Sequence, residues 1–272
     1  RHVLGKGFIA PSDQLTKGII GTGGMGRGHV NYAGTRLVAV CDVDKKHLEL
    51  GKQLVKEKIA AAAREAGIPV FERAQAWGAI MQRYENAICI AGTHGKTTTT
   101  AMTTHIFMAA QADPTVMIGG TLPMLHSGYR VGKGDTIILE SCEYCNSFLH
   151  FFPTVAVVLN IDADHLDFFK DLDDIKHSFR RFAQLVPADG KIVANADDAN
   201  AMDALKGLPL FTFGLDHPAD CRGENLTWNH GLPSFDIVID GKLYTSLSLH
   251  TAGRHNVLNA LAAAAAAYVL GI

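Results

Sequence analysis

The segment 87–100 constrains the fold of this chain more than any other part of the sequence. An apolar run, AICI at 87–90, passes directly into the glycine-flanked stretch AGTHGKTTTT at 91–100. A buried strand that turns and restarts as a helix aims backbone N–H groups and the positive end of the helix at one point, which suits a polyphosphate. The segment therefore predicts a strand–loop–helix unit that binds a nucleoside triphosphate.

The residues of this loop have separate expected roles. Lys96 would supply the point charge for the β- and γ-phosphates, and the hydroxyl of Thr97 would be a ligand of Mg²⁺. The spacing departs from the common G-x-x-x-x-G-K-[ST] form, because the position five before Gly95 is Ile90 and the usable glycine is Gly92. The other loop residues expected to contact ATP are Thr93, His94 and Thr98. A structural turn without a ligand is the alternative interpretation.

Composition limits the class of protein. The 272 residues are 47% hydrophobic and 19% charged, which is typical of a soluble globular chain with one large domain or two smaller ones. The net charge of −2 and the lack of a long basic run favour neither a nucleic-acid partner nor an anionic membrane surface. No segment approaches the roughly 18 unbroken apolar residues of a membrane span, and 1–16 lacks the apolar core of a signal peptide. We expect a cytoplasmic protein.

The cysteines form an odd set. They are Cys41, Cys89, Cys142, Cys145 and Cys221. Cys142 and Cys145 make a C-x-x-C pair, but no second pair or His pair at zinc spacing accompanies them. We therefore expect reduced thiols, two of them in apolar strand-like runs, rather than a zinc or redox site.

The second part of the chain alternates apolar runs with helix-compatible segments, which predicts an α/β fold with a mainly parallel sheet covered by helices. The expected strands are 87–91, 136–139, 154–159, 191–194 and 210–213, the expected helices 97–110 and 173–185, and a short Ala-rich helix is expected at 259–272. Near the end, 235–239 and 242–247 flank Asp240-Gly241, a dipeptide typical of a type I′ hairpin turn. This hairpin would add an antiparallel edge to the sheet.

The first part has a different character. Its sequence GTGGMG at 21–26 is a G-x-G-x-x-G turn, and Asp42 follows its first glycine by about twenty residues, the distance expected for an acid that holds a ribose hydroxyl. The residues expected to form this nucleotide-binding loop are Gly21, Gly23, Gly24, Gly26 and Asp42. We expect a short, Rossmann-like and incomplete domain at 1–82 and a P-loop domain at 83–272, with the boundary placed by the change of pattern.

Four further motifs follow the phosphate loop. They are ESCEYCNSFL at 140–149, NIDADHLD at 160–167, NADD at 195–198 and GRHNVLNA at 253–260. The first three follow expected strands, so they would meet the loop at the carboxyl edge of one sheet. From about residue 61 to the end, the chain resembles the Mur ligases, and within them the branch that adds L-alanine to UDP-N-acetylmuramate. The turn at 21–26 resembles the UDP-binding turn of these ligases and equally the cofactor turn of the Gfo/Idh/MocA oxidoreductases, so it would hold a UDP-sugar or a dinucleotide. The whole segment 17–54 resembles the oxidoreductases more.

The resemblance to the Mur ligases implies a reaction of peptidoglycan synthesis. ATP would phosphorylate the carboxylate of UDP-N-acetylmuramate, and the amino group of L-alanine would displace phosphate from the acyl phosphate. Because two anions must approach in line, cationic charge must offset their repulsion. Lys96, Glu140 and His165 would be the catalytic residues, with Thr97 and Glu140 holding one Mg²⁺ and His165 a second. The adenosine would lie against His255, Asn256 and Asn259.

Each of these residues also has a simpler interpretation. Glu140 could end a strand at solvent, and His165 could be a surface histidine paired with the neighbouring aspartates. Imidazole is also not a preferred partner of Mg²⁺, which favours oxygen. Asn256 and Asn259, three apart and so on one helix face, could be helix caps.

One departure from the family bears on activity. Mur ligases end in a third domain that binds the amino acid, whereas this sequence stops at Ile272, so we expect the C-terminal ligase domain to be absent and ligation by this chain to be incomplete. Two alternatives stay open. The chain could be a non-catalytic ATP-binding fragment, or an NAD(P)-dependent oxidoreductase of the Gfo/Idh/MocA type.

Overall fold

The fold is described from a computed structural model that covers residues 15–20, 35–41, 53, 57, 61–67 and 71–272 of the chain. The chain divides into two compact units, Arg1–Glu72 and Arg73–Ile272. In the first unit, the strands β1 (Leu15–Ile20) and β2 (Thr35–Cys41) pair in parallel. The glycine loop expected at 21–26, and Asp42, lie outside the described residues.

The described part of the second unit contains a ten-stranded sheet with the order β12-β11-β10-β9-β8-β7-β3-β6-β4-β5. The strands from β10 to β4 in this order pair in parallel, and antiparallel pairs form at both edges, β5 on β4 and β11 and β12 beyond β10. The strands are β3 (Asn86–Ala91), β4 (Thr115–Leu122), β5 (Ser127–Arg130), β6 (Thr136–Glu140), β7 (Val155–Val158), β8 (Lys191–Asn195), β9 (Leu210–Gly214), β10 (Cys221–Asn229), β11 (Leu232–Ile239) and β12 (Lys242–Ser248). The expected mainly parallel α/β sheet is confirmed.

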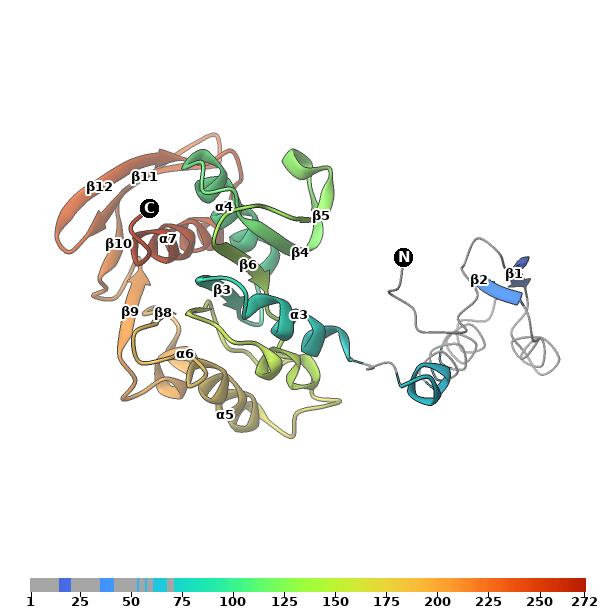
Figure 1. Ribbon diagram of the computed structural model, residues 1–272. Helices are drawn as coiled ribbons and strands as arrows, with labels where there is room; N and C mark the ends of the chain where they lie inside the picture. Colours follow the sequence, from blue (N-terminus) through green and yellow to red (C-terminus); the bar gives the residue numbers. More distant parts are fainter. Residues whose placement is uncertain (1–14, 21–34, 42–52, 54–56, 58–60, 68–70) are drawn as a thin grey trace. The chain divides into compact units, whose positions relative to one another are not determined.

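Helices cover both faces of this sheet (Figure 1). Residues of α4 and α7 pack on one face, and residues of α3, η4, α5 and α6 pack on the other. The helices are α3 (Arg73–Met81), α4 (Lys96–Ala109), α5 (Leu172–Ala183), α6 (Ala199–Ala204) and α7 (Arg254–Tyr268), with the 3-10 segments η3 (Pro123–Leu125) and η4 (Tyr144–His150). This arrangement leaves the loops at the carboxyl ends of the parallel strands free to form a site.

The apolar run of β3 is explained by burial on both faces of the sheet. Ile88 and Ile90 point into the core under α4 and α7, while Cys89 and Ala91 point into the core under α5. A strand in the middle of a parallel sheet therefore has no polar side, which is why this sequence is continuously hydrophobic rather than alternating.

The threonine-rich sequence of α4 is compatible with a buried helix because three of its buried hydroxyls find partners, although the buried Thr99 hydroxyl has none among the described residues. Thr100, Thr103 and Thr104 donate hydrogen bonds to the carbonyls four residues earlier, at 2.7 to 2.9 Å. The facing helix α7 is lined by buried alanines over 262–267, whose small side chains allow the two helices to pack closely. The helix expected at 259–272 thus begins five residues earlier than predicted, at Arg254.

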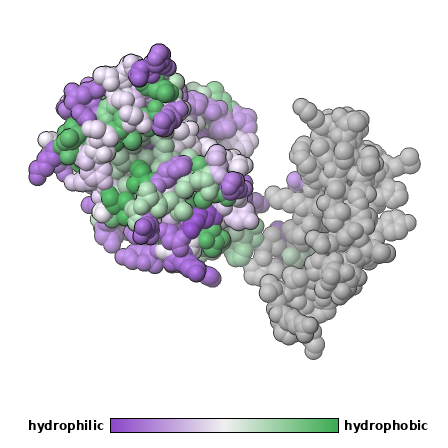
Figure 2. Space-filling view, turned by 90° about the horizontal axis from the view of Figure 1, so that it is seen from above, coloured by the Kyte–Doolittle hydropathy of each residue, from purple (hydrophilic) through white to green (hydrophobic). Residues whose placement is uncertain are grey.

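The turn between β11 and β12 has the backbone conformation that its sequence predicts. Asp240 and Gly241 both have positive φ, 51° and 75°, as the predicted type I′ turn between β11 and β12 requires. The face seen in Figure 2 mixes hydrophilic and hydrophobic side chains. Among the helices that the structure describes, none is long and apolar enough to cross a bilayer.

The aromatic core under η4 should carry a large share of stability. Phe148 is fully buried, stacks on Phe182 at 4.6 Å between ring centroids, and meets Phe179 edge-on at 5.3 Å. Phe148→Ala should lower the free energy of unfolding by about 3–5 kcal/mol in urea denaturation, because it removes a ring and leaves a cavity. Val131→Ala, at a side chain that is 78% exposed, should change it by less than about 0.5 kcal/mol. Equal effects of the two substitutions would contradict this packing.

Candidate functional site

The phosphate loop depends on two glycines at positions that no side chain could occupy. Gly92 has φ 150°, and a Cβ there would lie 2.8 Å from the Cβ of Leu159. Gly95 has φ 84°, and a Cβ there would lie 2.6 Å from Oδ1 of Asn259. The loop therefore passes directly between the end of β7 and the start of α7, and both glycines are required by the fold.

Asn160, directly after β7, fixes the backbone of the loop. Its side-chain Oδ1 accepts a hydrogen bond from the N–H of His94 at 2.7 Å, and its Nδ2 donates to the carbonyl of His94 at 3.0 Å. The Asn160 carbonyl also accepts from the N–H of Thr93, at 3.1 Å. The Thr93 hydroxyl accepts from the N–H of Asp162 at 2.9 Å. Because His94 is held through its backbone, its imidazole is left exposed.

Lys96 lies at the start of α4 and has a charged partner that the sequence analysis did not single out. Its Nζ donates to the carbonyl of Gly92 at 2.5 Å, to the carbonyl of Thr93 at 3.1 Å, and to Oε2 of Glu143 at 3.0 Å. The Glu143 side chain is only 2% exposed. The buried carboxylate of Glu143 holds the Lys96 ammonium in position, and each charge compensates the other.

Thr97 and Glu140 form an oxygen pair beside the loop. The Thr97 hydroxyl donates to Oε1 of Glu140 at 3.1 Å, and the N–H of Gly119 donates to Oε2 of Glu140 at 2.7 Å. A hydroxyl and a carboxylate are the hard oxygen ligands that Mg²⁺ prefers, so these two residues fit the predicted ion. Glu140 is not a strand end pointing freely to solvent, because Gly119 fixes its orientation.

His165 lies beside Glu143 rather than in contact with the Thr97 and Glu140 pair. Its Nε2 is 3.9 Å from Oε1 of Glu143, and its ring packs on Tyr144 at 4.7 Å between centroids. Its backbone has φ 53°, and its N–H donates to the side chain of Asp164 at 2.7 Å. A left-handed conformation at a non-glycine residue costs free energy, and at this position it aims the imidazole at the loop side of the site.

The ring of Tyr144 packs against the imidazole of His165. Its hydroxyl donates to Oδ2 of Asp167 at 2.9 Å, and the hydrogen bond and negative charge of Asp167 raise the pKa of Tyr144 to about 12. The phenol therefore stays protonated and keeps this bond over the physiological range. The ring also meets Phe168 edge-on, which holds the segment that carries His165.

The residues expected at the adenosine surround a small cavity on the other side of the loop. Its volume is about 130 Å³, and it is lined by His94, Gly95, Leu159, Asn160, Asn195, Phe213, His255, Leu258 and Asn259. Nδ2 of Asn259 donates to Oδ1 of Asn256 at 3.2 Å, and Nδ2 of Asn256 donates to the carbonyl of Ala252 at 2.7 Å. Neither amide accepts from a helix N–H as a cap would, since α7 has Gly253 at its N-cap and no side-chain cap.

Side chains of the NADD motif at 195–198 hydrogen-bond to backbone groups of the segments beside the site. Nδ2 of the buried Asn195 donates to the carbonyl of Leu159 at 2.9 Å. The Asp198 carboxylate accepts from the N–H of Ala201 at 2.7 Å and caps α6, and burial raises its pKa. The Asp197 carboxylate accepts backbone N–H bonds from the turn after β9, and although burial opposes the charged form, these bonds lower its pKa.

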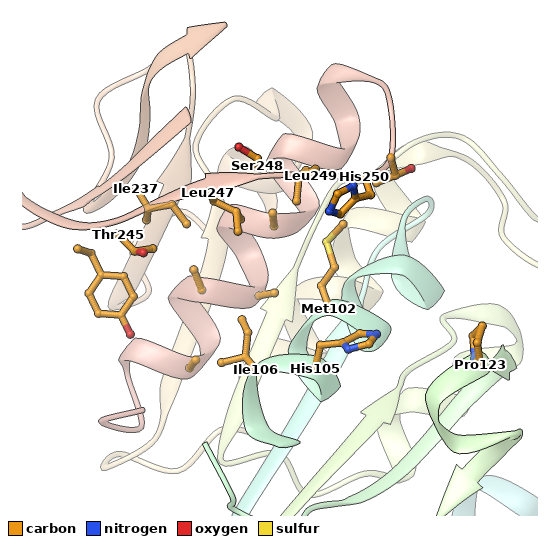
Figure 3. A pocket seen from close by; sticks show the side chains of 16 residues that line it. Met102, His105, Ile106, Pro123, Ile237, Thr245, Leu247, Ser248, Leu249 and His250 are labelled. Atoms are coloured by element: carbon orange, nitrogen blue, oxygen red, sulfur yellow. The ribbon is translucent and has the colours of Figure 1, made fainter. Parts of the chain in front are cut away.

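The further cavities in the described part of the chain include two larger ones. One of about 430 Å³ borders Glu140 and is lined by Arg73, Met117, Ile118, Gly119, Gly120, Thr121, Gly128, Glu140 and Cys142. The other, about 1030 Å³, is an apolar groove between α4, α7 and the β11–β12 hairpin, where Met102 and Ile106 face Ile237 and Leu247 (Figure 3). The first adjoins the predicted metal ligands, whereas no charged Lys, Arg, Asp or Glu side chain lines the second.

Cys89, Cys142, Cys145 and Cys221 are free thiols. Cys142 and Cys145, the C-x-x-C pair, are half-buried and exposed, and burial raises the pKa of Cys142. Cys89 is buried in the sheet, and its pKa is raised by burial to about 12. Among the described residues, no group of three or more His, Cys, Asp and Glu side chains is arranged to hold a metal ion.

The strand order and the loop geometry define a P-loop domain of the α/β class. The sequence pattern of the Mur ligase middle domain matches residues 90–267. This match covers more than half of the chain, so the chain belongs to the Mur ligase family.

Two relatives with high sequence identity bear the name of the same enzyme. The chain is 45% identical over 213 residues to UDP-N-acetylmuramate–L-alanine ligase of Caldanaerobacter subterraneus subsp. tengcongensis, which covers 77% of this chain and 46% of the relative. It is also 45% identical over 215 residues to the same-named ligase of Agathobacter rectalis, covering 78% of this chain and 47% of the relative. The chain thus spans a little under half the length of these relatives.

Solved structures give the same result for the fold. The chain superposes on UDP-N-acetylmuramate:L-alanyl-γ-D-glutamyl-meso-diaminopimelate ligase of Neisseria meningitides with a TM-score of 0.68, at 25% identity, covering 95% of this chain and 94% of that one. UDP-N-acetylmuramate–alanine ligase of Thermotoga maritima gives 0.68 at 23% identity, covering 95% of this chain and 65% of that one.

The contact between Gly119 and Glu140 gives a test of the predicted metal ligands. A Cβ on Gly119 would lie 2.7 Å from Oε1 of Glu140 and displace the carboxylate from Thr97. Gly119→Ala should therefore reduce the Mg²⁺-dependent gain in ADP affinity, measured by calorimetry, by about tenfold. Gly120→Ala is the matched control, because its Cβ would make only an ordinary contact of 3.5 Å with Thr97. The same Mg²⁺ dependence in both variants would contradict the role of Glu140.

Proposed function

We propose that this chain is the ATP-binding module of a ligase that joins L-alanine to the carboxyl group of UDP-N-acetylmuramate, in the cytoplasm where ATP and nucleotide sugars are made. The observation that carries the proposal is the convergence of the phosphate loop, Glu140 and His165 in a chain 45% identical to ligases of that name. ATP and Mg²⁺ are the cofactors that this function requires.

The reaction has two steps. A carboxylate oxygen of the sugar attacks the γ-phosphorus of ATP, so that an acyl phosphate forms and ADP leaves. The neutral amino nitrogen of L-alanine then attacks the acyl carbon, an amide bond forms, inorganic phosphate leaves with the C–O bond electrons, and the nitrogen loses one proton to water. Both steps bring anions or dipoles together, so the protein contributes mainly positioning and charge neutralisation.

The residues of the site have distinct parts in this reaction. The loop N–H groups and the Lys96 ammonium would bind the β- and γ-phosphates, which accept hydrogen bonds from both. Thr97 and Glu140 would hold Mg²⁺, which neutralises phosphate charge when it is bound. The cavity of about 430 Å³ beside Glu140 would take the reacting carboxylate, with Arg73 as its cation. The role of His165 at a second Mg²⁺ rests on the resemblance to the family.

The adenosine would lie at the cavity of about 130 Å³ beside Asn259. The Asn256 and Asn259 side chains are 7% and 6% exposed and hydrogen-bonded to each other, so the amide that faces Gly95 has a fixed orientation. A fixed amide can read the polar edge of adenine or a ribose hydroxyl. His255 is exposed at the rim of the same cavity.

Removal of the Lys96 charge tests nucleotide binding. Replacing Lys96 alone would leave the carboxylate of Glu143 buried without a partner, at a cost of about 3–5 kcal/mol of stability. The double variant Lys96→Met/Glu143→Gln removes both charges. In calorimetry it should bind Mg·ATP about a hundredfold more weakly than the unmodified chain. Lys170→Ala, at a side chain that is 87% exposed, should bind it normally.

NADH titrated into the same preparation separates the alternatives. Binding of Mg·ATP but not NADH is the expected result. NADH binding without Mg·ATP binding would favour the oxidoreductase, and an unchanged affinity in the double variant would contradict the assignment of Lys96. Mg·ATP binding without turnover of UDP-N-acetylmuramate and L-alanine would identify a non-catalytic nucleotide-binding chain.

A further inference from the structure

The hydrogen bonds of Lys96 are complete within the protein. An ammonium group has three N–H donors. In the structure their acceptors are the carbonyl of Gly92, the carbonyl of Thr93 and the carboxylate of Glu143, at 2.5, 3.1 and 3.0 Å. A phosphate oxygen that binds Lys96 must therefore take a donor from one of these three groups.

The three acceptors are not equally able to give up that donor. Gly92 and Thr93 belong to the loop itself, only four and three residues before Lys96, and their positions are fixed by Leu159 and Asn160. Glu143 comes from a different segment, between β6 and η4. It is also the acceptor that carries a negative charge, as a phosphate does. Glu143 is therefore the group with which a phosphate competes.

We propose that Glu143 is an internal counter-ion of Lys96 that incoming phosphates must displace, so that it sets how strongly nucleotide binding depends on Mg²⁺. This inference rests on the proposed function and deepens it. Once Lys96 turns to the phosphates, the carboxylate of Glu143 stays 2% exposed beside them, and its repulsion has to be offset. Mg²⁺ on the phosphates would supply that offset, and the imidazole of His165, with Nε2 3.9 Å from Oε1, lies beside the carboxylate that Lys96 would release.

The inference makes Glu143 a positioning residue rather than a ligand of the phosphates. Glu143→Gln keeps an oxygen that can accept from Lys96 but removes the charge that competes with phosphate. If the carboxylate only stabilised the fold, its removal would lower the affinities for the metal-free and the Mg²⁺-bound nucleotide together, or would change neither. A competing counter-ion instead weakens the binding of metal-free nucleotide more than the binding of the Mg²⁺ complex, because the metal already neutralises part of the phosphate charge.

The test titrates three forms of the chain by calorimetry: unmodified, Glu143→Gln, and the control Asp203→Asn, an exposed acid paired with Lys176. The probes are ADP with EDTA, inorganic pyrophosphate with EDTA, and Mg·ADP. Glu143→Gln should gain about tenfold in affinity for both metal-free probes and clearly less for Mg·ADP. The control should match the unmodified chain. Metal-free affinities that are unchanged or weaker in Glu143→Gln would overturn the inference.

Two further readouts separate the possible failures. An unmodified chain that binds no Mg·ADP would overturn the proposed function, whereas normal binding with no gain in Glu143→Gln overturns this inference alone. If Glu143→Gln does not fold, a crystal structure of the unmodified chain with Mg·ADP decides the matter. Lys96 Nζ should then lie beyond hydrogen-bond distance of Glu143, and a Lys96–Glu143 bond retained beside bound phosphate would overturn the inference.

Discussion

The site depends on the attachment of the phosphate loop to the end of the neighbouring strand. The Asn160 side chain bonds the backbone of His94 in both directions, and Gly92 lies against Leu159 with no room for a Cβ. Because β7 pairs directly with β3, the loop and this clamp belong to adjacent strands of one rigid sheet. The N–H groups of the loop are therefore held in place before any ligand arrives, which is how a protein avoids the free-energy cost of ordering a binding loop.

The same adjacency brings the remaining groups together. On the other side of β3, the strand β6 ends at Glu140, which meets the Thr97 hydroxyl at the start of α4. The start of α7 closes the opposite side through Asn259 and Gly95. Neutral amides thus face the small cavity on one side of the loop, and carboxylates face Lys96 and Thr97 on the other. This division matches the chemistry of a nucleotide, which has a base at one end and a polyphosphate with its metal at the other.

Much of this arrangement could be predicted from the sequence because its signals are local. The strand–loop–helix unit, the buried parallel strands, the Asp240-Gly241 turn and the family motifs were all visible as short patterns. β4 and α6 were not, because the Gly119-Gly120 pair interrupts the first and the second has only six residues.

The roles of Glu143 and Asn160 could not be read from the sequence. Glu143 pairs with Lys96 across 47 residues of sequence, and the clamp at Asn160 requires the order of strands in space. Gly119 shows the same limit, since its need for space comes from the side chain of Glu140, 21 residues away. The motif at 140–149 was identified as functional, but which of its two glutamates pairs with Lys96 depends on three-dimensional geometry.

We propose that the loop, the ends of β6 and β7, and the start of α7 bind one nucleotide together. Hydrogen–deuterium exchange of the chain with and without Mg·ADP tests this most directly, because it reports each segment separately. Bound Mg·ADP should slow exchange at 92–99, 140–144, 159–165 and 253–259 and leave the hairpin β11–β12 unchanged. Protection confined to the hairpin and its apolar groove, or absent from the loop while ADP is bound, would contradict it.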